Sequence, residues 1–256
     1  METDLAFAHE LADIADSISM KHYRSAGLVV QTKPDMTPVS EADRSVERAL
    51  RKKIAAERPG DSVVGEEFGD EGAAPRRWIL DPIDGTKSYV RGLPVFGTLI
   101  ALERDGDLVL GLASAPALGG RRWWATRGGG AFADGRPIRV SAVSRLEDAH
   151  VLYAGMRTWK EAGIRDRLLS LIDRAWRSRG LGDFWMHMLV AEGAAEIALE
   201  MEVNLWDLAS VKVVIEEAGG RFTDLDGRPT PSGGSSLSTN GLLHDVVLSI
   251  MSGETG

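Results

Sequence analysis

The sequence predicts an α/β protein of layered α+β type with mixed sheets. Residues 4–24 place apolar side chains three and four positions apart, the spacing of a helix with one buried face. Later segments alternate short β-branched runs with helical stretches, which indicates layers of helices on sheets. Of 256 residues, 43% are hydrophobic and 27% are charged, as in ordinary soluble globular proteins. This length suits one large domain or two closely packed halves.

The first half is expected to begin with two helices. The pattern over residues 4–24 carries acids among its apolar positions, which favours an amphipathic helix over a signal peptide. A polar loop is expected at Gln31–Pro38, because its prolines oppose regular structure. A second helix should begin at Ser40 and end at Arg58–Gly60. Its acids come in the first turn and its bases later, as the helix dipole favours.

Short apolar runs predict the strands of the first half. They are Ser62–Gly65, Trp78–Leu80, Val95–Leu102, Leu108–Ser114 and Trp123–Ala125. A turn at Arg104–Asp107 should join two of these strands as neighbours, and a loop is expected at Arg127–Gly130.

A junction near residues 137–147 predicts two halves, 1–140 and 141–256, within one compact unit. The second half is expected to alternate strands and helices. The strands are Ala149–Tyr153 and Glu196–Glu200, and the helices lie near 161–174, near 183–193 and at Leu208–Ala218. The last helix should stop at Gly219-Gly220, since glycine is common just after a helix.

The composition excludes several classes of function. There is no cysteine, which rules out disulfides, thiolate nucleophiles and cysteine-based metal sites. A net charge of −8 argues against a broad nucleic-acid surface, which needs clustered Lys and Arg. No apolar run approaches the roughly 18 residues of a membrane span. We therefore expect a cytoplasmic protein with no nucleic-acid or membrane partner.

Two carboxylates lie in one turn of the segment WILDPIDGTKSY, residues 78–89. Asp81 comes at the end of an apolar strand, and Asp84 returns to the same side after Pro82. Carboxylates this close repel each other unless a cation lies between them, and oxygen ligands favour magnesium, calcium or manganese. The N–H groups of the turn and of the helix end beside it would bind a phosphate. Alternatively, both aspartates are turn and N-cap residues.

Three further acids occupy similar junctions between elements. They are Glu66, Asp207 and Asp43. Each has a simpler explanation: Glu66 as a solvated loop charge, Asp207 as an N-cap, and Asp43 as an acid that complements the helix dipole. They can form one site only if the fold brings them together, which spacing alone does not establish.

Three segments resemble the signatures of the inositol monophosphatase-like family. They are GEE at 65–67, WILDPIDGT at 78–86 and WDLASVKVVIEEAGG at 206–220, and the similarity runs from the first helix to STNGLLHD near the C-terminus. The resemblance implies the α-β-α-β-α layers of inositol monophosphatases and sugar phosphatases. It also implies a magnesium-dependent phosphomonoesterase, in the form of a homodimer. Most metal ligands would lie in the N-terminal half, and the substrate loop and Asp207 in the C-terminal half.

The resemblance also implies two to three magnesium ions in each site. Glu66, Asp81 and the backbone carbonyl of Ile83 would hold the first ion. Asp81, Asp84 and Asp207 would hold the second, and Glu66 would contact a third, weaker ion through water.

Other positions match the family's catalytic and phosphate-binding residues. Asp43 and Thr86 correspond to the pair that orients the attacking water, and the N–H groups of Gly85 and Thr86 would bind the phosphate. Lys33 matches the family's flexible segment, so the resemblance implies a loop there that closes near the metals. Water activated by metal would attack in line, so no protein nucleophile is required. The five histidines are scattered, which argues against a histidine-based phosphatase.

Two local features resemble family members that act on L-histidinol phosphate, in histidine synthesis. Lys87-Ser88-Tyr89 follow DPIDGT, where inositol phosphatases usually have another residue and then Asn-Phe. Gly182-Asp183 stand in the substrate loop, where inositol enzymes have small neutral residues. Histidinol carries an ammonium group and an imidazole, so its pocket should be anionic. Asp183 would pair with the amine, and Glu200 matches the family's substrate-contacting acid.

Alternatives stay open for these residues and for the function. Asp183 could instead cap the helix that follows it, and Glu200 could be a surface charge. The activity could be that of an inositol-1-phosphate phosphatase or a broad sugar- and nucleotide-phosphate phosphatase. A different class would be an RNA- or transcription-complex accessory protein on this fold, although the intact acids and the lack of a basic run argue against it. We expect Trp123, Trp124 and Trp185 to pack, and His187 and His244 to be structural or exposed.

Overall fold

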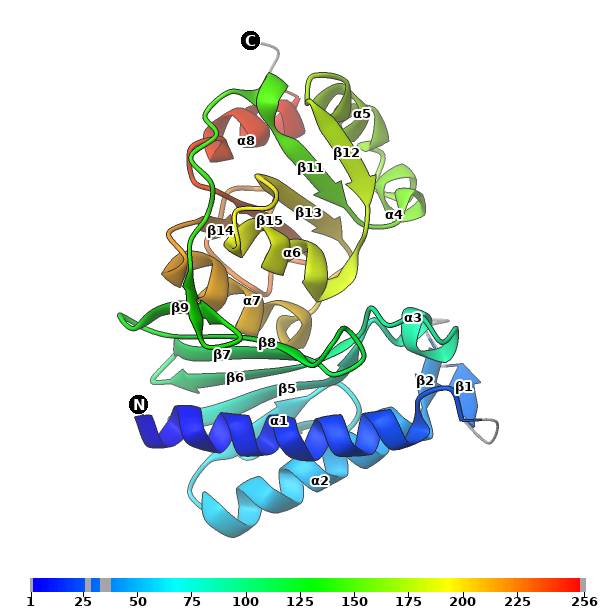
Figure 1. Cartoon of the computed structure of the whole chain (residues 1–256), viewed down its shortest axis with the longest axis vertical. Coiled ribbons are helices and arrows are strands. Elements are labelled where there is room, and N and C mark those ends of the chain that lie inside the picture. Colours follow the sequence, from blue (N-terminus) through cyan, green and yellow to red (C-terminus); the bar gives the residue numbers. More distant parts are fainter. Residues whose placement is uncertain (1, 26–28, 33–37, 254–256) are drawn as a thin grey trace.

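The fold is known from a computed structural model that describes residues 2–25, 29–32 and 38–253. Within these residues two large sheets are separated and flanked by helices, in the order α-β-α-β-α (Figure 1), and two further strands form a small ribbon. The helices α1 and α2 cover the outer face of the larger sheet, α6 and α7 lie between the sheets, and α4, α5 and α8 cover the smaller sheet. The predicted fold class and its layers are confirmed.

The outer helices are α1 (Glu2–His22) and α2 (Glu41–Glu57). Their apolar faces, including Leu11 and Leu50, pack on the larger sheet. The ring of Phe7 meets that of Trp78 edge-on at 5.4 Å between centroids. This packing anchors α2 beside the site described below.

The larger sheet has eight strands in the order β10-β9-β8-β7-β6-β5-β3-β4. Its strands are β3 (Ser62–Gly65), β4 (Gly69–Glu71), β5 (Arg76–Asp84), β6 (Gly97–Arg104), β7 (Asp107–Ala115), β8 (Arg121–Thr126), β9 (Gly130–Ala133) and β10 (Arg136–Ile138). Neighbours are antiparallel except β3 and β5, which are parallel. Asp105 and Gly106 join β6 to β7 with φ angles of 53° and 84°, as a tight hairpin requires. The predicted turn is therefore confirmed.

The expectation of an irregular loop over Gln31–Pro38 was wrong at both ends of that segment, where the chain forms strands. β1 (Val30–Thr32) and β2 (Pro38–Ser40) pair as a small antiparallel ribbon, with proline at the first position of its strand. Lys33 and the rest of 33–37 lie outside the described residues.

The smaller sheet has the order β12-β11-β13-β15-β14. Its strands are β11 (His150–Tyr153), β12 (Arg177–Gly180), β13 (Ile197–Met201), β14 (Arg221–Thr223) and β15 (Ser235–Thr239). The strands β12, β11 and β13 are parallel to one another, and β15 is antiparallel to both of its neighbours. Residues 139–145 form no helix or strand and connect the two sheets.

The helices of the second half are short. They are α4 (Met156–Glu161), α5 (Arg165–Asp173), α6 (Asp183–Ala191), α7 (Leu205–Glu217) and α8 (His244–Ser252), with a 3-10 turn at Leu146–Asp148. The single helix expected near 161–174 was wrong at its start. Gly163, with φ of 74°, ends α4 and separates it from α5.

Buried aromatic and histidine side chains lie largely as expected. Trp123 is fully buried between the sheets, and Trp124 and Trp185 pack against the two cores. His244 is buried and hydrogen-bonded to the hydroxyls of Thr223 and Thr239, which makes it structural. None of the described helices combines the length and the apolar character that crossing a membrane requires.

Candidate active site

A break in the pairing of β5 with β6 brings two aspartates to the same side. Asp81 lies opposite Leu99 and Asp84 opposite Gly97, and the register shifts between them. The hydroxyl of Thr98 donates to the carbonyl of Pro82 at 2.8 Å, which holds this irregular turn from β6. The turn therefore places both carboxylates at the carboxyl end of β5, on the side of the sheet against which α7 packs.

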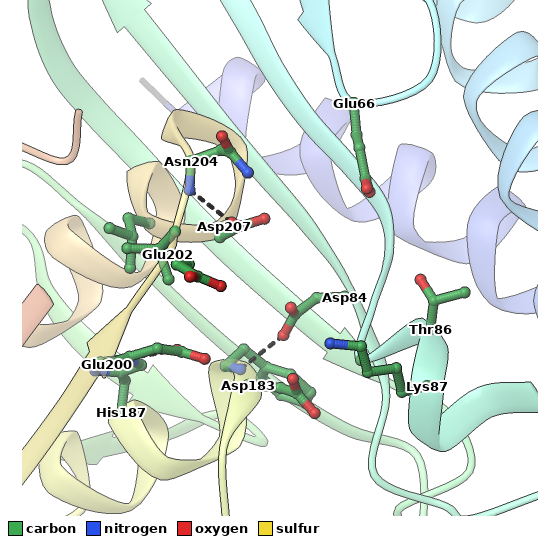
Figure 2. Close-up of a pocket in the computed structure, with 14 residues that line it drawn as sticks. Glu66, Asp84, Thr86, Lys87, Asp183, His187, Glu200, Glu202, Asn204 and Asp207 are labelled. Carbon is green, nitrogen blue, oxygen red and sulfur yellow. Dashed lines mark hydrogen bonds and ion pairs between the residues drawn. The ribbon is translucent and has the colours of Figure 1, made fainter. Parts of the chain in front are cut away.

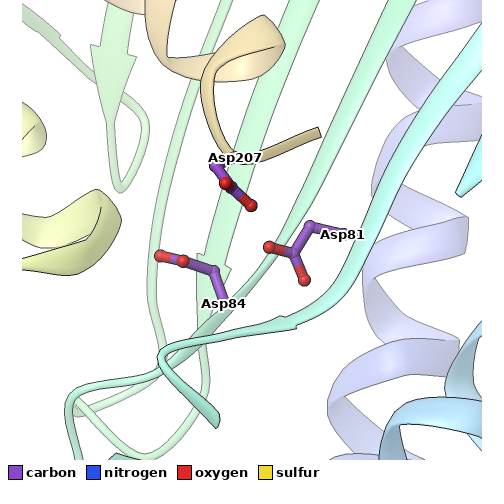
Figure 3. Close-up of side chains that lie close together, drawn as sticks. All are labelled: Asp81, Asp84 and Asp207. Carbon is purple, nitrogen blue, oxygen red and sulfur yellow. The ribbon is translucent and has the colours of Figure 1, made fainter. Parts of the chain in front are cut away.

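Asp207, in the first turn of α7, completes a group of three aspartates (Figure 3). Each of Asp81, Asp84 and Asp207 offers a carboxylate oxygen within 4.8 Å of the other two. Backbone N–H groups hold two of them: that of Asn204 donates to Asp207 at 2.7 Å, and that of Phe184 donates to Asp84 at 2.6 Å. Asp207 therefore takes part in the capping box of α7 and in this group at once.

The three carboxyl groups are held where negative charge is unfavourable. Asp81 is 1% exposed, and its Oδ1 has no hydrogen-bond partner among the described residues. Burial raises the pKa of Asp81 well above its ordinary value, and the charges of Glu66, Asp84 and Asp207 raise it further. Burial and nearby acids raise the pKa of Asp84 in the same way, and burial raises that of Asp207 to about 6.

A divalent cation would satisfy this arrangement. It would remove the repulsion between the carboxylates and accept the orphaned oxygen of Asp81 as a ligand. Hard oxygen donors suit magnesium, manganese or calcium. The residues present therefore fit the metal that the resemblance implies.

Glu66 reaches the same pocket from a neighbouring strand. It follows β3, which runs parallel to β5, and its N–H donates to the carbonyl of Leu80 at 3.2 Å. Figure 2 shows its side chain pointing into the pocket that Asp84 and Thr86 also line.

Asp43 and Thr86 meet although 43 positions separate them. The hydroxyl of Thr86 lies 3.2 Å from Asp43 Oδ1 and 2.9 Å from the carbonyl of Ile83, and it can donate to only one of them at a time. Asp43 is fully buried, which raises its pKa, and it also accepts from the N–H of Ser40 at 2.8 Å to cap α2. Its capping role and its contact with Thr86 therefore coexist.

The turn that carries Thr86 needs glycine before it. Gly85 has φ of 79°, a conformation that other residues rarely adopt. A Cβ atom at Gly85 would lie 3.0 Å from the carbonyl oxygen of Val95 and 3.1 Å from a carboxylate oxygen of Asp183. The short helix α3 (Thr86–Val90) starts directly after it.

Asp183 lies at the start of α6, with a carboxylate oxygen close to Gly85. The helix cap is Gly182, and no side chain forms a capping hydrogen bond, so Asp183 does not cap the helix as one alternative held. Its backbone has φ of 54°, which aspartate tolerates better than most residues. Burial and the charge of Glu200 raise the pKa of Asp183 to about 7, although Lys87 lowers it.

Glu200 lies on β13, and its side chain is 16% exposed, so the surface-charge alternative was wrong. Burial raises its pKa to about 7, although Lys87 lowers it.

Sequence reasoning missed the part that His187 plays in this pocket. His187 is 1% exposed, its Nδ1 lies 2.8 Å from the hydroxyl of Ser238, and its Nε2 lies 3.9 Å from Glu200. That Nε2 has no hydrogen-bond partner in the described part of the chain. Burial lowers the pKa of His187 to about 3, so the ring is neutral. Its position one helical turn after Asp183 is the pattern that could have indicated it.

Of the predicted site residues, Glu66, Asp84, Gly85, Thr86, Asp183, Glu200 and Asp207 line one pocket between the two sheets (Figure 2), whereas Asp43, Asp81 and Ile83 do not line it. Besides the predicted residues, it is lined by Lys87, Phe184, His187, Glu202, Val203, Asn204 and Leu208. Lys87 is the one cationic side chain among the described residues of its lining. The pocket thus joins an acidic end, lined by Asp84 and Asp207, to a second acidic region at Asp183 and Glu200.

Comparisons with known proteins agree with this geometry. The model of the inositol monophosphatase family matches residues 1–252. A histidinol-phosphatase of Streptomyces coelicolor is 50% identical over 254 residues, which cover 96% of this chain and 95% of that protein. A histidinol-phosphatase of Mycobacterium tuberculosis is 51% identical and covers 96% of both chains. A solved structure of a Thermotoga maritima IMPase is 30% identical, with a TM-score of 0.89 over 99% of this chain and 98% of that one.

Proposed function

The chain belongs to the inositol monophosphatase family, and from that premise we propose that it is a magnesium-dependent phosphomonoesterase that hydrolyses L-histidinol phosphate to L-histidinol and phosphate. The observation that carries the substrate is a pair of largely buried acids, Asp183 and Glu200, in the pocket that Asp84 and Asp207 of the aspartate group also line. Such a pair calls for a cationic group on the ligand. The 50% and 51% identical relatives named histidinol-phosphatases support the same substrate.

The acidic end of the pocket would hold two to three magnesium ions. Asp81, Asp84 and Asp207 would bind one, and Asp81, Glu66 and the carbonyl of Ile83 would bind another. Bound magnesium supplies activation of water and neutralisation of the charge on the phosphate and on the leaving oxygen. The side chains themselves set where the phosphate can lie.

Asp43 and Thr86 would orient the attacking water. When the carbonyl of Ile83 is engaged elsewhere, the hydroxyl of Thr86 donates to Asp43 and keeps its own lone pairs free. Those lone pairs then accept a hydrogen bond from water and direct it toward phosphorus. The N–H groups of Gly85 and Thr86 would bind a phosphate oxygen, and the reaction needs no covalent intermediate.

The other end of the pocket would recognise histidinol. With the phosphate at the aspartates, the ammonium group would pair with Asp183. The imidazole would lie near Glu200 and near the unpartnered Nε2 of His187. Each hydrogen bond to a charged group contributes about 1.5–3 kcal/mol, enough to favour an amino alcohol over a neutral polyol.

One assay tests this proposal. Phosphate release is measured from L-histidinol phosphate, inositol 1-phosphate and adenosine 3′,5′-bisphosphate, each with magnesium and with EDTA. We expect kcat/KM to be at least about tenfold higher for histidinol phosphate, from one charged hydrogen bond. Activity should disappear in EDTA. A preference for inositol phosphate would refute the substrate, and full activity in EDTA would refute the metal.

Two further expectations belong to this proposal. A homodimer is expected from the family, and light scattering of the purified protein tests it. Lys33, which lies outside the described residues, is expected near the metals when substrate is bound, and the KM of a Lys33→Ala variant tests that.

A further inference from the structure

Helix α2 carries a second buried acid that the mechanism above does not use. Glu47 lies four residues after Asp43, on the same face of the helix, and is fully buried. An acid is almost never fully buried without partners, so its partners indicate what it does.

Within the described part of the chain, the hydrogen-bond partners of Glu47 belong to the turn after β3 or are Arg51 on the next turn of the helix. Its Oε2 accepts from the N–H of Glu67 at 2.7 Å, and its Oε1 accepts from the N–H of Phe68 at 3.2 Å. Arg51 Nε donates to Oε1 at 2.8 Å, and the same guanidinium also donates to the carbonyl of Gly69. The paired side chains of Glu47 and Arg51 therefore hold the turn from Glu67 to Gly69 through hydrogen bonds to its backbone.

Gly65 lets this carboxylate approach so closely. A Cβ atom at Gly65 would lie 2.1 Å from Glu47 Oε1, far inside contact distance. The GEE segment thus joins a glycine that admits Glu47 to the acid, Glu66, that faces the pocket.

We propose that Glu47 is a positioning residue that sets the metal affinity of the site by fixing the direction of Glu66; this rests on the proposed metal dependence. The backbone of Glu66 is held on both sides. Its own N–H donates to Leu80 on β5, and the next N–H, of Glu67, donates to Glu47. These two bonds fix the peptide groups that flank Glu66, and therefore the direction in which its side chain leaves the chain.

The same helix holds the opposite side of the site. Asp43 contacts Thr86 in the turn after β5, and Glu47 contacts the turn after β3. Four residues of helix rise about 6 Å, and packing on the sheet holds α2 in place. One helix thus sets the separation between Glu66 and Thr86.

The variant Glu47→Gln tests this assignment. Glutamine keeps the size of glutamate, but its NH2 group must face either the N–H groups of the turn or the guanidinium of Arg51, all of which are donors. We expect Mn²⁺ alone, measured by calorimetry, to bind the variant about 10- to 100-fold more weakly, as when outer partners of metal ligands are changed. The magnesium concentration for half-maximal activity should rise in parallel, while kcat at saturating magnesium falls less.

Glu71→Gln is the matched control. Glu71 pairs with the same Arg51, at 3.1 Å, but its side chain is 79% exposed. Its Mn²⁺ affinity should equal that of the wild type.

An unchanged Mn²⁺ affinity in a folded Glu47→Gln protein would overturn the proposal. If that variant does not fold, the variant Arg51→Met replaces it, because it removes one hydrogen-bond donor to Glu47. We expect it to bind Mn²⁺ several-fold more weakly than the wild type does. Mn²⁺ affinity equal to that of the wild type would overturn the proposal. If the wild type binds no Mn²⁺, the proposed metal-dependent function fails, and this inference fails with it. Loss of histidinol-phosphate preference with Mn²⁺ binding intact would leave this inference standing.

Discussion

Replacing Asp183 with asparagine separates substrate recognition from metal binding. The change removes one negative charge and keeps the shape of the side chain. Asparagine also tolerates the backbone φ of 54° at this position, so α6 should start as it does now. The N–H of Phe184 that donates to Asp84 is unaffected by the change.

The structure sets the size of the expected effect. With a pKa of about 7, half of the Asp183 carboxyl groups are protonated at pH 7, so ionising them for a cationic ligand costs only about 0.4 kcal/mol. The hydrogen bond to an ammonium group contributes about 1.5–3 kcal/mol. The difference corresponds to a loss of roughly 6- to 80-fold in kcat/KM for histidinol phosphate. The amide oxygen of asparagine still accepts a hydrogen bond, which favours the lower half of that range.

The assay compares two substrates over a range of pH. With p-nitrophenyl phosphate, which has no ammonium group, the variant should keep its KM to within about threefold. In the wild type, KM for histidinol phosphate should fall as pH rises through about 7, because Asp183 ionises there, and this dependence should weaken in the variant. Asp173→Asn, at the exposed end of α5, removes the same charge far from the pocket and serves as control.

Equal losses on both substrates would refute this reasoning. Asp183 would then act on the reacting end of the pocket, through the neighbouring Phe184 and Asp84. A pH dependence of KM that is unchanged in the variant would also count against it.

Two further predictions concern Asp84 in the aspartate group and Asp183 in the second acidic region. Asp84→Asn should lower magnesium-dependent kcat by about 10³-fold, because it removes several kcal/mol of charge stabilisation, while circular dichroism stays that of the wild type; retained turnover would contradict the ligand assignment. The metal-free protein should lose stability as pH rises from about 6.5 to 8. Burial raises the folded pKa of Asp183 to about 7, far above its ordinary 3.8, so the folded chain holds that proton more tightly than the unfolded chain does. A Tm lower by roughly 2–4 °C at the higher pH in EDTA is expected, magnesium should reverse it, and a Tm independent of pH would disprove it.

The sequence predicted those parts of the site that are close along the chain. Asp81 and Asp84 lie in one turn, so a short motif is enough to place their carboxylates together. Asp43, Glu66 and Asp207 each have a local explanation, and only the resemblance indicated that they share a site. The structure shows that Asp43 and Asp207 have the local role and a place at the site as well. Each belongs to the capping box of its helix, while Asp43 contacts Thr86 and Asp207 lines the pocket.

Two of the strands that sequence reasoning missed, β12 and β15, lack an apolar pattern. β12 is RSRG at the edge of its sheet, and β15 is SSLST, buried through small polar residues. Pairing with neighbours defines both of them, since their own side chains carry little preference.

By itself the sequence determined the layered α/β class and the acidic turn at Asp81–Asp84, because these follow from local spacing and backbone preference. Only the tertiary structure decided which residues from distant parts of the chain meet around the site. The contacts of Thr86 with Asp43, of His187 with Glu200 and of Glu47 with the Glu66 turn join residues on different elements. Their distances depend on how α2, α6 and the two sheets pack, and packing is set by the whole core.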